Sequence, residues 1–397
     1  MAKLLALKHG LSLAHRVIRR GDIEAIPARL WTSKLLGLAD RNGRTVLLEV
    51  AAKGRLDLLP RDCLTSALFL QPDKLKGQTP ALLAARYGQV EFLPPGMLTK
   101  ALFLKPDNHG RNMGHAAALG GHLDQFPSAW MTPDVVCHLG GKPATSIAHI
   151  LAAKGDLLRI PAAVRTEAFY RLRDGLGDTI GHKAIHRIES IPAKFITREF
   201  LALRNKDGMT IAHAAARGGV LDKLPAGLLT PDMLRWGAWT RLGSTVAHSA
   251  ALSGRIDQIP ARMLTMDLLT KGGAGNWTPA HIIAIMETLD RLPRALLTTE
   301  LLSTAESDGH TVAHLAAARG QLACVPPGLI TRRLIQKTTE DGDTVLWFAA
   351  QRGYLHHVPE PALTREFLLR KGSDRRTPLS YLKPKDRAAL LSRVSCR

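Results

Sequence analysis

The stretch IPARLWTSKLL, residues 26–36, contains the pattern that decides the fold. An apolar residue and a proline are followed five positions later by a threonine and then by a pair of apolar residues. The pattern recurs as LPRDCLTSALF at residues 59–69 and, for the eleventh and last time, as VPEPALTREFL at residues 358–368. Successive prolines lie 33 to 35 residues apart, apart from one step of 31. Such a regular period predicts a solenoid, in which neighbouring repeats bury a shared core.

A second motif stands about fifteen residues before each proline. It reads GMTIAHAAARGG at residues 208–219, GHTVAHLAAARG at 309–320 and GRTVLLEVAAKG at 43–54. The first glycine permits a tight turn, the threonine hydroxyl can cap a helix, and the alanines let neighbouring helices approach closely. A closing glycine suits a left-handed helix end. The motif therefore predicts a turn followed by a short buried helix.

This motif resembles the ankyrin-repeat signature G-x-T-P-L-H-x-A-A-x-x-G, and the period of about 33 residues agrees along nearly the whole chain. In that family the histidine bonds within its own turn and to the next repeat. The resemblance therefore implies a structural role for the histidines at this position: His15, His115, His149, His182, His213, His248, His281 and His314.

The second half of the repeat departs from the family. A proline would break one long helix, so we predict a short helix that opens at the proline and a third short helix capped by the threonine. Thr132-Pro133-Asp134 has the order of cap, first-turn proline and first-turn acid. The predicted fold is an all-α solenoid of about eleven ankyrin-like repeats of 33–34 residues. It forms a single domain over residues 1–382, and residues 383–397 form a C-terminal capping helix or tail.

Two repeats are irregular. The repeat from Thr179 to Pro192 lacks two residues and the closing glycine, and Glu287-Thr288 stands where another repeat has its glycine. Both irregularities predict a local change in how the repeats stack.

The chain has no sequence motif of catalysis. It lacks a P-loop, a dinucleotide fingerprint, a G-x-S-x-G sequence and a pair of catalytic carboxylates. His182, His186 and Glu189 lie at helical spacing, but His182 belongs to the structural series. The four cysteines show no metal-binding spacing and read as reduced thiols. We therefore predict a protein that is not an enzyme and has no cofactor or metal, no small-molecule substrate and no membrane span, since apolar runs stay below roughly 18 residues.

The net charge of +20 points toward an acidic partner. Many bases fall between the third helix of one repeat and the glycine of the next, the segment that forms the projecting fingers in ankyrin repeats. We predict that these finger residues bind the partner: Arg41, Arg44, Lys74, Lys76, Lys105, Arg111, Arg171, Arg173, Arg204, Lys206, Arg235, Trp236, Trp239 and Arg241. Lys142 falls in the same segment. Acids that alternate with these bases favour the opposing interpretation, in which the fingers carry charges only because exposed residues keep the protein soluble. These acids are Asp40, Asp73, Asp107, Asp174 and Asp207.

The distribution of charge adds a constraint. Residues 1–275 carry +15 and residues 342–397 carry +6, whereas residues 276–341 hold six basic and seven acidic residues. Any track for a polyanion should be interrupted in that balanced segment.

Two functions remain open. One is a monomeric cytoplasmic scaffold that binds an acidic partner protein along its concave, basic finger face. The other is a nucleic-acid binder that touches the phosphate backbone with the same face and lies in the nucleoid or nucleus. Aromatic residues are scarce in the fingers, which argues against base stacking on single strands.

Overall fold

The computed structural model describes residues 7–8, 11–238 and 244–395 of the chain. Short helices account for most of the regular structure there, and they recur in the order predicted by the two motifs. The chain divides into two compact units, residues 1–184 and residues 185–397. The single domain over residues 1–382 stays a prediction.

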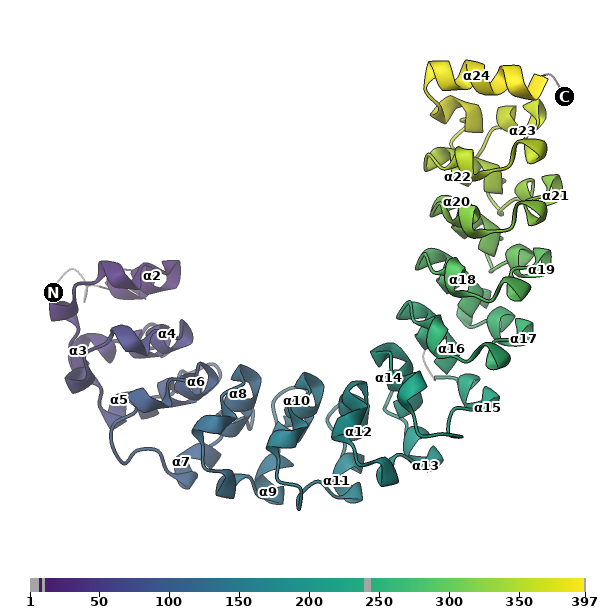
Figure 1. Cartoon of the computed structure of the whole chain (residues 1–397). Coiled ribbons are helices and arrows are strands. Elements are labelled where there is room, and N and C mark those ends of the chain that lie inside the picture. The colour runs from purple at the N-terminus through teal and green to yellow at the C-terminus, as the bar shows by residue number, and fades with distance from the viewer. Residues whose placement is uncertain (1–6, 9–10, 239–243, 396–397) are drawn as a thin grey trace. The chain divides into compact units, whose positions relative to one another are not determined.

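Each repeat contributes one longer helix, opened by the Thr-x-x-His motif or its variant. In unit 1 these helices are α2 (Leu13–Arg20), α4 (Val46–Ala52), α6 (Pro80–Arg86), α8 (Met113–Gly120), α10 (Ile147–Lys154) and α12 (Ile180–Ala184). In unit 2 they are α14 (Ile211–Gly218), α16 (Val246–Leu252), α18 (Pro279–Ile285), α20 (Val312–Ala318) and α22 (Val345–Gln351). Within each unit they lie side by side, as Figure 1 shows.

A short third helix closes each repeat. Within each unit these helices form a second row beside the row of longer helices (Figure 1). Unit 1 contains α3 (Ser33–Leu36), α5 (Ser66–Leu70), α7 (Lys100–Leu104), α9 (Pro133–Val136) and α11 (Glu167–Arg171). Unit 2 contains α13 (Arg198–Leu201), α15 (Pro231–Leu234), α17 (Met266–Thr270), α19 (Thr299–Ser303), α21 (Arg332–Ile335) and α23 (Arg365–Leu369). The apolar pair that ends the sequence pattern faces the core in most repeats, and Leu35, Leu36, Leu301 and Leu302 are fully buried, whereas Leu68 and Leu102 are half-buried.

The threonine of the proline pattern caps the third helix, as predicted. The Thr230 hydroxyl accepts the amide of Met233 at 3.2 Å, and Thr265 accepts that of Leu268 at 3.2 Å. Thr65 and Thr132 are corrections to this prediction, because neither side chain makes the capping bond.

The proline itself does not lie inside a helix, which corrects a second detail of the prediction. Pro27 and Pro260 have extended backbone and stand just before single 3₁₀ turns, η2 (Ala28–Leu30) and η13 (Ala261–Met263). After Pro94 and Pro225 only a simple turn forms, where Gly96 and Gly227 take positive φ angles of 75° and 81°. A turn of three residues, such as Ala28–Leu30, is too short to form the hydrogen bonds of an α-helix. The proline therefore fixes a corner of the chain and leaves the helices on either side intact.

Narrow hairpins connect the repeats and form the fingers. One of them is a two-stranded ladder of β3 (Leu139–Gly140) and β4 (Thr145–Ser146), and β1 (Leu7–Lys8) pairs with β2 (Leu11–Ser12) at the start of unit 1. Other fingers close by a single bridge, such as Ala39 with Thr45 and Ala305 with Thr311.

Both irregular repeats differ in backbone. In the repeat that lacks two residues, α12 ends at Ala184, and Arg187 breaks the following 3₁₀ segment (Ile185–Ser190) with φ −116° and ψ 64°. Glu287 adopts a positive φ of 60°, the angle that glycine supplies in neighbouring repeats. The chain closes with α24 (Pro384–Ser395), which packs on α23 in the place of the predicted cap. No helix in the described ranges combines the length and the apolar character needed to cross a bilayer.

Candidate functional site

The fingers of unit 1 are joined tip to tip by backbone hydrogen bonds. Lys74 donates its amide to Asn42 O at 2.8 Å, and Asn108 donates to Lys76 O at 3.0 Å. The series continues with Gly141 to His109 O at 2.7 Å and Gly175 to Ala144 O at 2.6 Å. These bonds fix the spacing of five consecutive fingers, so side chains at their tips form an ordered row.

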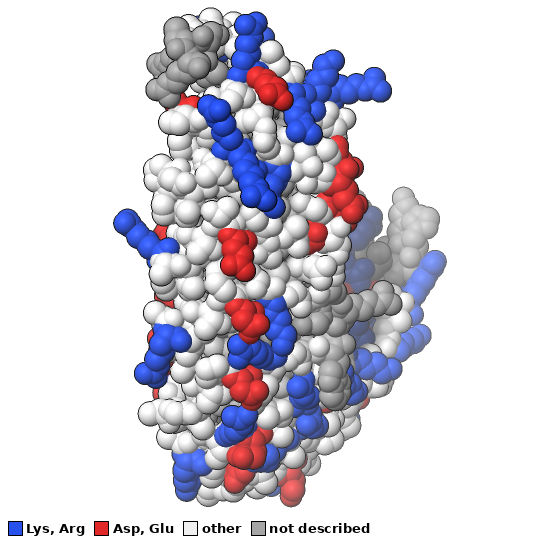
Figure 2. All heavy atoms as spheres, turned by 90° about the vertical axis from the view of Figure 1, so that its right-hand side faces the viewer, with Lys and Arg blue, Asp and Glu red and all other residues white. Residues whose placement is uncertain are grey.

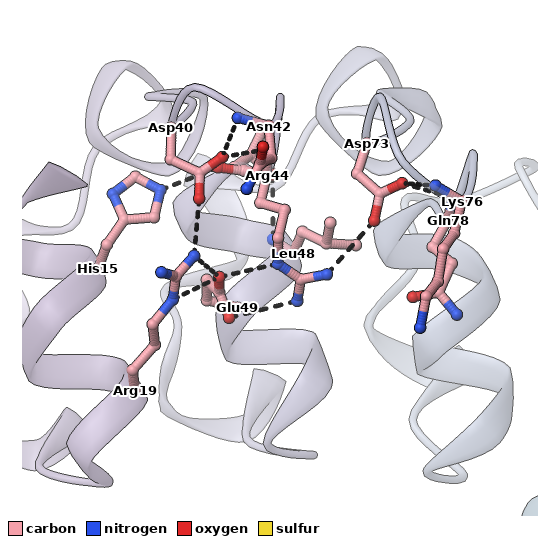
Figure 3. A network of polar contacts seen from close by, with 11 residues as sticks. His15, Arg19, Asp40, Asn42, Arg44, Leu48, Glu49, Asp73, Lys76 and Gln78 are labelled. Carbon is pink, nitrogen blue, oxygen red and sulfur yellow. Dashed lines mark hydrogen bonds and ion pairs between the residues drawn. The ribbon is translucent and has the colours of Figure 1, made fainter. Parts of the chain in front are cut away.

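The acids of these fingers point inward. The Asp40 carboxylate accepts the amides of Asn42 and Arg44, both at 2.9 Å, and Asp73 accepts the amide of Lys76 at 2.7 Å. Figure 3 shows both carboxylates turned into their own turns. Asp107 and Asp174 accept amides of their turns in the same way. Four of the five finger acids therefore hold their own turns together and do not serve solubility alone.

Asp207 differs from the other four acids. Asn205 stands where four fingers of unit 1 have the aspartate that accepts the amides of the turn. It accepts the amides of Asp207 and Met209, both at 3.0 Å. The Asp207 side chain is exposed. The finger of unit 2 at this position therefore presents an acid beside Lys206, unlike the fingers of unit 1.

Five bases in the fingers of unit 1 are exposed and make no side-chain hydrogen bond or ion pair within the described ranges. We call them the basic surface of unit 1: Arg41, Lys74, Lys76, Lys105 and Lys142. With the acids turned inward, charged groups of one sign project from the linked fingers. A pocket of about 240 Å³ opens between the second and third fingers, with Lys105, Asp107 and Asn108 in its lining.

Arg44 belongs to the interior of the array. Its guanidinium lies 2.9 Å from Glu49 and 3.3 Å from Asp73, and Arg19 reaches Glu49 and Asp40 from the preceding repeat (Figure 3). Burial would raise the pKa of Glu49, but hydrogen bonds and charge from Arg44 and Arg19 outweigh it and lower that pKa. This network ties three repeats together, so we assign Arg44 to the fold.

Other predicted finger residues are also engaged within their unit. Arg171 pairs with Glu167 at 2.8 Å, Arg173 donates to Gly177 O at 2.8 Å, and the half-buried Arg111 lies against Gly141. In unit 2, Arg204 donates to the carbonyls of Gly208 at 2.6 Å and Gly237 at 2.7 Å, which bridges two fingers. These arginines support turns as well as carrying charge.

Arg235 and Trp236 lie on the side of the third helices. Arg235 pairs with Asp267 at 2.6 Å, and the Trp236 indole donates to Asp232 at 3.3 Å beneath the guanidinium of Arg198. Figure 2, which looks onto the third helices of unit 2, shows acidic and basic side chains close together over the lower part of this face. Lys206 is exposed. Trp239 and Arg241 fall outside the described residues.

The two fingers of unit 2 at residues 306–310 and 339–343 carry the opposite charge at their tips. Asp308, Glu340 and Asp341 are exposed, whereas Glu306 is buried and accepts the amides of Asp308 and His310, both at 3.0 Å. The balanced charge of this segment was predicted from the sequence, but the acidic tips were not. The sequence did contain a signal for these tips, because an acid that precedes a turn glycine either accepts the amides of the turn or projects into solvent.

Metal-ligand geometry arises in one place within the described ranges. Ligand atoms of Glu306, Asp308 and His310 lie within 4.8 Å of one another. The Glu306 carboxylate already accepts two amides and contacts the His310 ring at 2.9 Å, so its oxygens serve the turn. The expectation of a protein without a metal stays a prediction.

The histidine series holds each finger to the following helix. His213 accepts the Thr210 amide on Nδ1 at 3.1 Å and donates from Nε2 to Ser244 O in the next finger at 3.1 Å. His281 repeats this with His310 O at 3.1 Å, and His115, His248 and His314 follow the same pattern. The structural role implied by the family resemblance is confirmed. The repeats are ankyrin-like in these bonds, in their turns and in their helices.

Comparison with known proteins adds little to this geometry. No protein-family model matches the chain, and no curated protein matches it. Among solved structures, the ankyrin repeat domain of Bcl-3, described as a unique member of the IkappaB protein family, is similar over 62% of this chain and 97% of that one. The identity is 18% and the TM-score 0.31, so this likeness carries no argument about function.

Proposed function

We propose that the protein is a non-enzymatic scaffold that binds an acidic partner protein through the basic surface of unit 1. One observation carries the proposal: the acids of the unit 1 fingers are turned into their own turns while the bases project. Exposed charges of one sign raise the local concentration of an oppositely charged partner and speed its association.

The linked fingertips favour an extended partner. Backbone bonds hold the tips in a fixed row, so a partner can meet several bases at once without ordering them first. Contact with bases of this kind is additive and weakens with salt. The partner should therefore present a row of carboxylates along a strand, helix or disordered segment.

Nucleic acid is the second candidate, since a phosphate backbone also presents a row of negative charge. The same exposed bases support it. Its affinity should fall more steeply with salt than that of a carboxylate chain, because phosphate contacts release condensed counterions.

The test is reversal of four exposed bases to glutamate, in the variant R41E/K74E/K76E/K142E. Binding is measured by fluorescence anisotropy with two labelled probes, a polyglutamate chain and a short DNA duplex, at low and at physiological salt. We expect the affinity for polyglutamate to fall by roughly tenfold or more at low salt and much less at high salt.

The matched control reverses four exposed bases of unit 2, in the variant R294E/R332E/R333E/R365E, and changes the net charge equally. Equal losses in the two variants would contradict the proposal, because only total charge would then matter. If the duplex binds more tightly than polyglutamate at low salt and its affinity falls more steeply toward physiological salt, the nucleic-acid candidate replaces the acidic protein.

A further inference from the structure

Unit 2 contains an apolar pocket between two neighbouring helices. It lies between α16 and α18 and has a volume of about 260 Å³. The residues that line it are the apolar Leu252, Trp277, Ile282, Ile285 and Met286 together with Ser244 and His248. None of these residues belongs to the basic surface of unit 1.

Stacking of the repeats does not require apolar residues at this place. Leu252 is 43% exposed and Met286 is 42% exposed. The position of Leu252, seven residues after the capping threonine, is held by Arg217 in α14 and by Gln351 in α22, and both are exposed. The position of Met286 is held by Ser253 in α16. The fold accepts polar residues here, so the apolar ones have another use.

The His248 ring beside the pocket is already bonded. His248 donates from Nε2 to Trp277 O at 3.0 Å and contacts Thr245 with Nδ1 at 2.7 Å. An occupant therefore finds mainly apolar walls, and both nitrogens of the His248 ring are engaged within the repeats. A volume of about 260 Å³ lies below the roughly 300 Å³ at which small-molecule sites begin. It suits one or two side chains of another protein.

Acidic fingertips continue from the finger that supplies Trp277. Ser307 donates its amide to Gly275 O at 2.9 Å, and Glu340 donates to Asp308 O at 3.0 Å. The two following tips therefore stand in register with that finger, and they expose Asp308, Glu340 and Asp341. One base, Lys271, is exposed in the finger that carries Trp277, and Glu287 pairs with Arg319 at 3.7 Å.

We propose that this pocket binds a basic segment of a partner protein, with an aliphatic or aromatic side chain in the pocket and flanking lysines or arginines against Asp308, Glu340 and Asp341. A buried apolar anchor supplies affinity, while complementary charges at the rim select the partner and speed its approach. The site lies in unit 2 and takes the opposite charge to the basic surface of unit 1, so it goes beyond the proposed function.

The experiment uses the full chain and three labelled peptides of equal length. The first carries phenylalanine between lysines, the second has serine in place of phenylalanine, and the third has glutamate in place of lysine. Fluorescence anisotropy should show the first binding at least about tenfold more tightly than either of the others, since only it satisfies both the pocket and the rim.

Two variants locate the contact. L252Q/M286S places in the pocket the residues that stand at these positions in α22 and α16, so the repeat remains compatible with the fold. It should lose about tenfold in affinity for the phenylalanine peptide at any salt concentration, as expected for loss of an apolar anchor. D308K/E340K should lose affinity chiefly at low salt.

The control is L158Q, which removes a leucine that is 63% exposed in unit 1. Thermal unfolding verifies that every variant is folded. The proposal is overturned if the serine peptide binds as well as the phenylalanine peptide, or if L252Q/M286S is folded and binds as tightly as L158Q does. Neither result bears on polyglutamate binding by unit 1, so the two proposals fail independently.

Discussion

The capping histidine His213 works as a neutral side chain. In His213, Nδ1 accepts the Thr210 amide and Nε2 donates to the next finger, so the neutral tautomer with a proton on Nε2 satisfies both contacts. A second proton on Nδ1 would face an N–H donor. Burial also lowers the pKa of His115, His213 and His314 from 6.5 to about 4.

Stability should therefore fall as the solution is acidified below pH 6.5. The unfolded chain takes up these protons near pH 6.5, whereas the folded chain resists them until about pH 4. Their contribution to stability is complete above pH 6.5 and is lost as the pH falls toward 4. Each histidine adds a slope of about 1.4 kcal/mol per pH unit in that window. Urea unfolding at a series of pH values from about 7.5 down to about 4.5 measures how the free energy of unfolding changes with pH.

Leucine replaces the capping histidine in two repeats of the chain itself, which suggests a variant that tests the role of the histidine. Leu48 and Leu82 stand where most of the other repeats have histidine. His314→Leu should lower the free energy of unfolding at neutral pH, because two hydrogen bonds are lost, and should make its pH dependence shallower by about one histidine. An unchanged pH dependence would contradict the assignment of the neutral tautomer.

Third helices of four or five residues depend on their caps, since so short a helix has few internal hydrogen bonds. Thr265→Ala should cost about 1 kcal/mol because the bond to the Leu268 amide is lost. Thr65→Ala is the matched control, since Thr65 stands at the same position and makes no such bond. Urea unfolding of both variants gives the difference, and equal costs would show that the cap does not contribute.

Close packing of neighbouring long helices depends on small residues at the crossing. A Cβ atom at Gly120 of α8 would collide with the carbonyl oxygen of Arg86 in α6. Gly120→Ala should therefore destabilise unit 1 by about 1–3 kcal/mol through overpacking. Gly328→Ala should be nearly neutral, because open space surrounds that position. Thermal unfolding compares the two, and a neutral Gly120→Ala would mean that α6 and α8 can separate without cost.

At the scale of the whole molecule, the net charge of +20 acts on stability and on binding in opposite directions. Self-repulsion of a strongly charged chain destabilises the compact state, and salt screens it. Raising the salt concentration from low to physiological should therefore raise the midpoint of thermal unfolding while it weakens polyglutamate binding. Circular dichroism and anisotropy measure the two effects, and a falling midpoint would show that ion pairs such as Arg19 with Glu49 outweigh the repulsion.

Much of the repeat could be predicted from the sequence because its parts act locally. A Thr-x-x-His sequence caps its own helix, a glycine permits the turn of its own hairpin, and a proline restricts its own backbone. The motif at residues 208–219 therefore predicts the same structure in every repeat that contains it. The lost caps at Thr65 and Thr132 could not be predicted in this way, since the local sequence order is the same with and without the bond.

The binding surfaces depended on the tertiary structure, because the direction of a side chain is decided by its neighbours. Asp40 and Lys74 are both charged finger residues in the sequence, but backbone amides turn the carboxylate inward while the ammonium group projects. Arg44 is drawn inward by Glu49 and Asp73, which come from the same repeat and the next one. The sequence by itself determined the period, the helices and the excess of positive charge. Only the tertiary structure decided which charges reach solvent and that Leu252 and Met286 meet in one pocket, since burial depends on contacts between repeats.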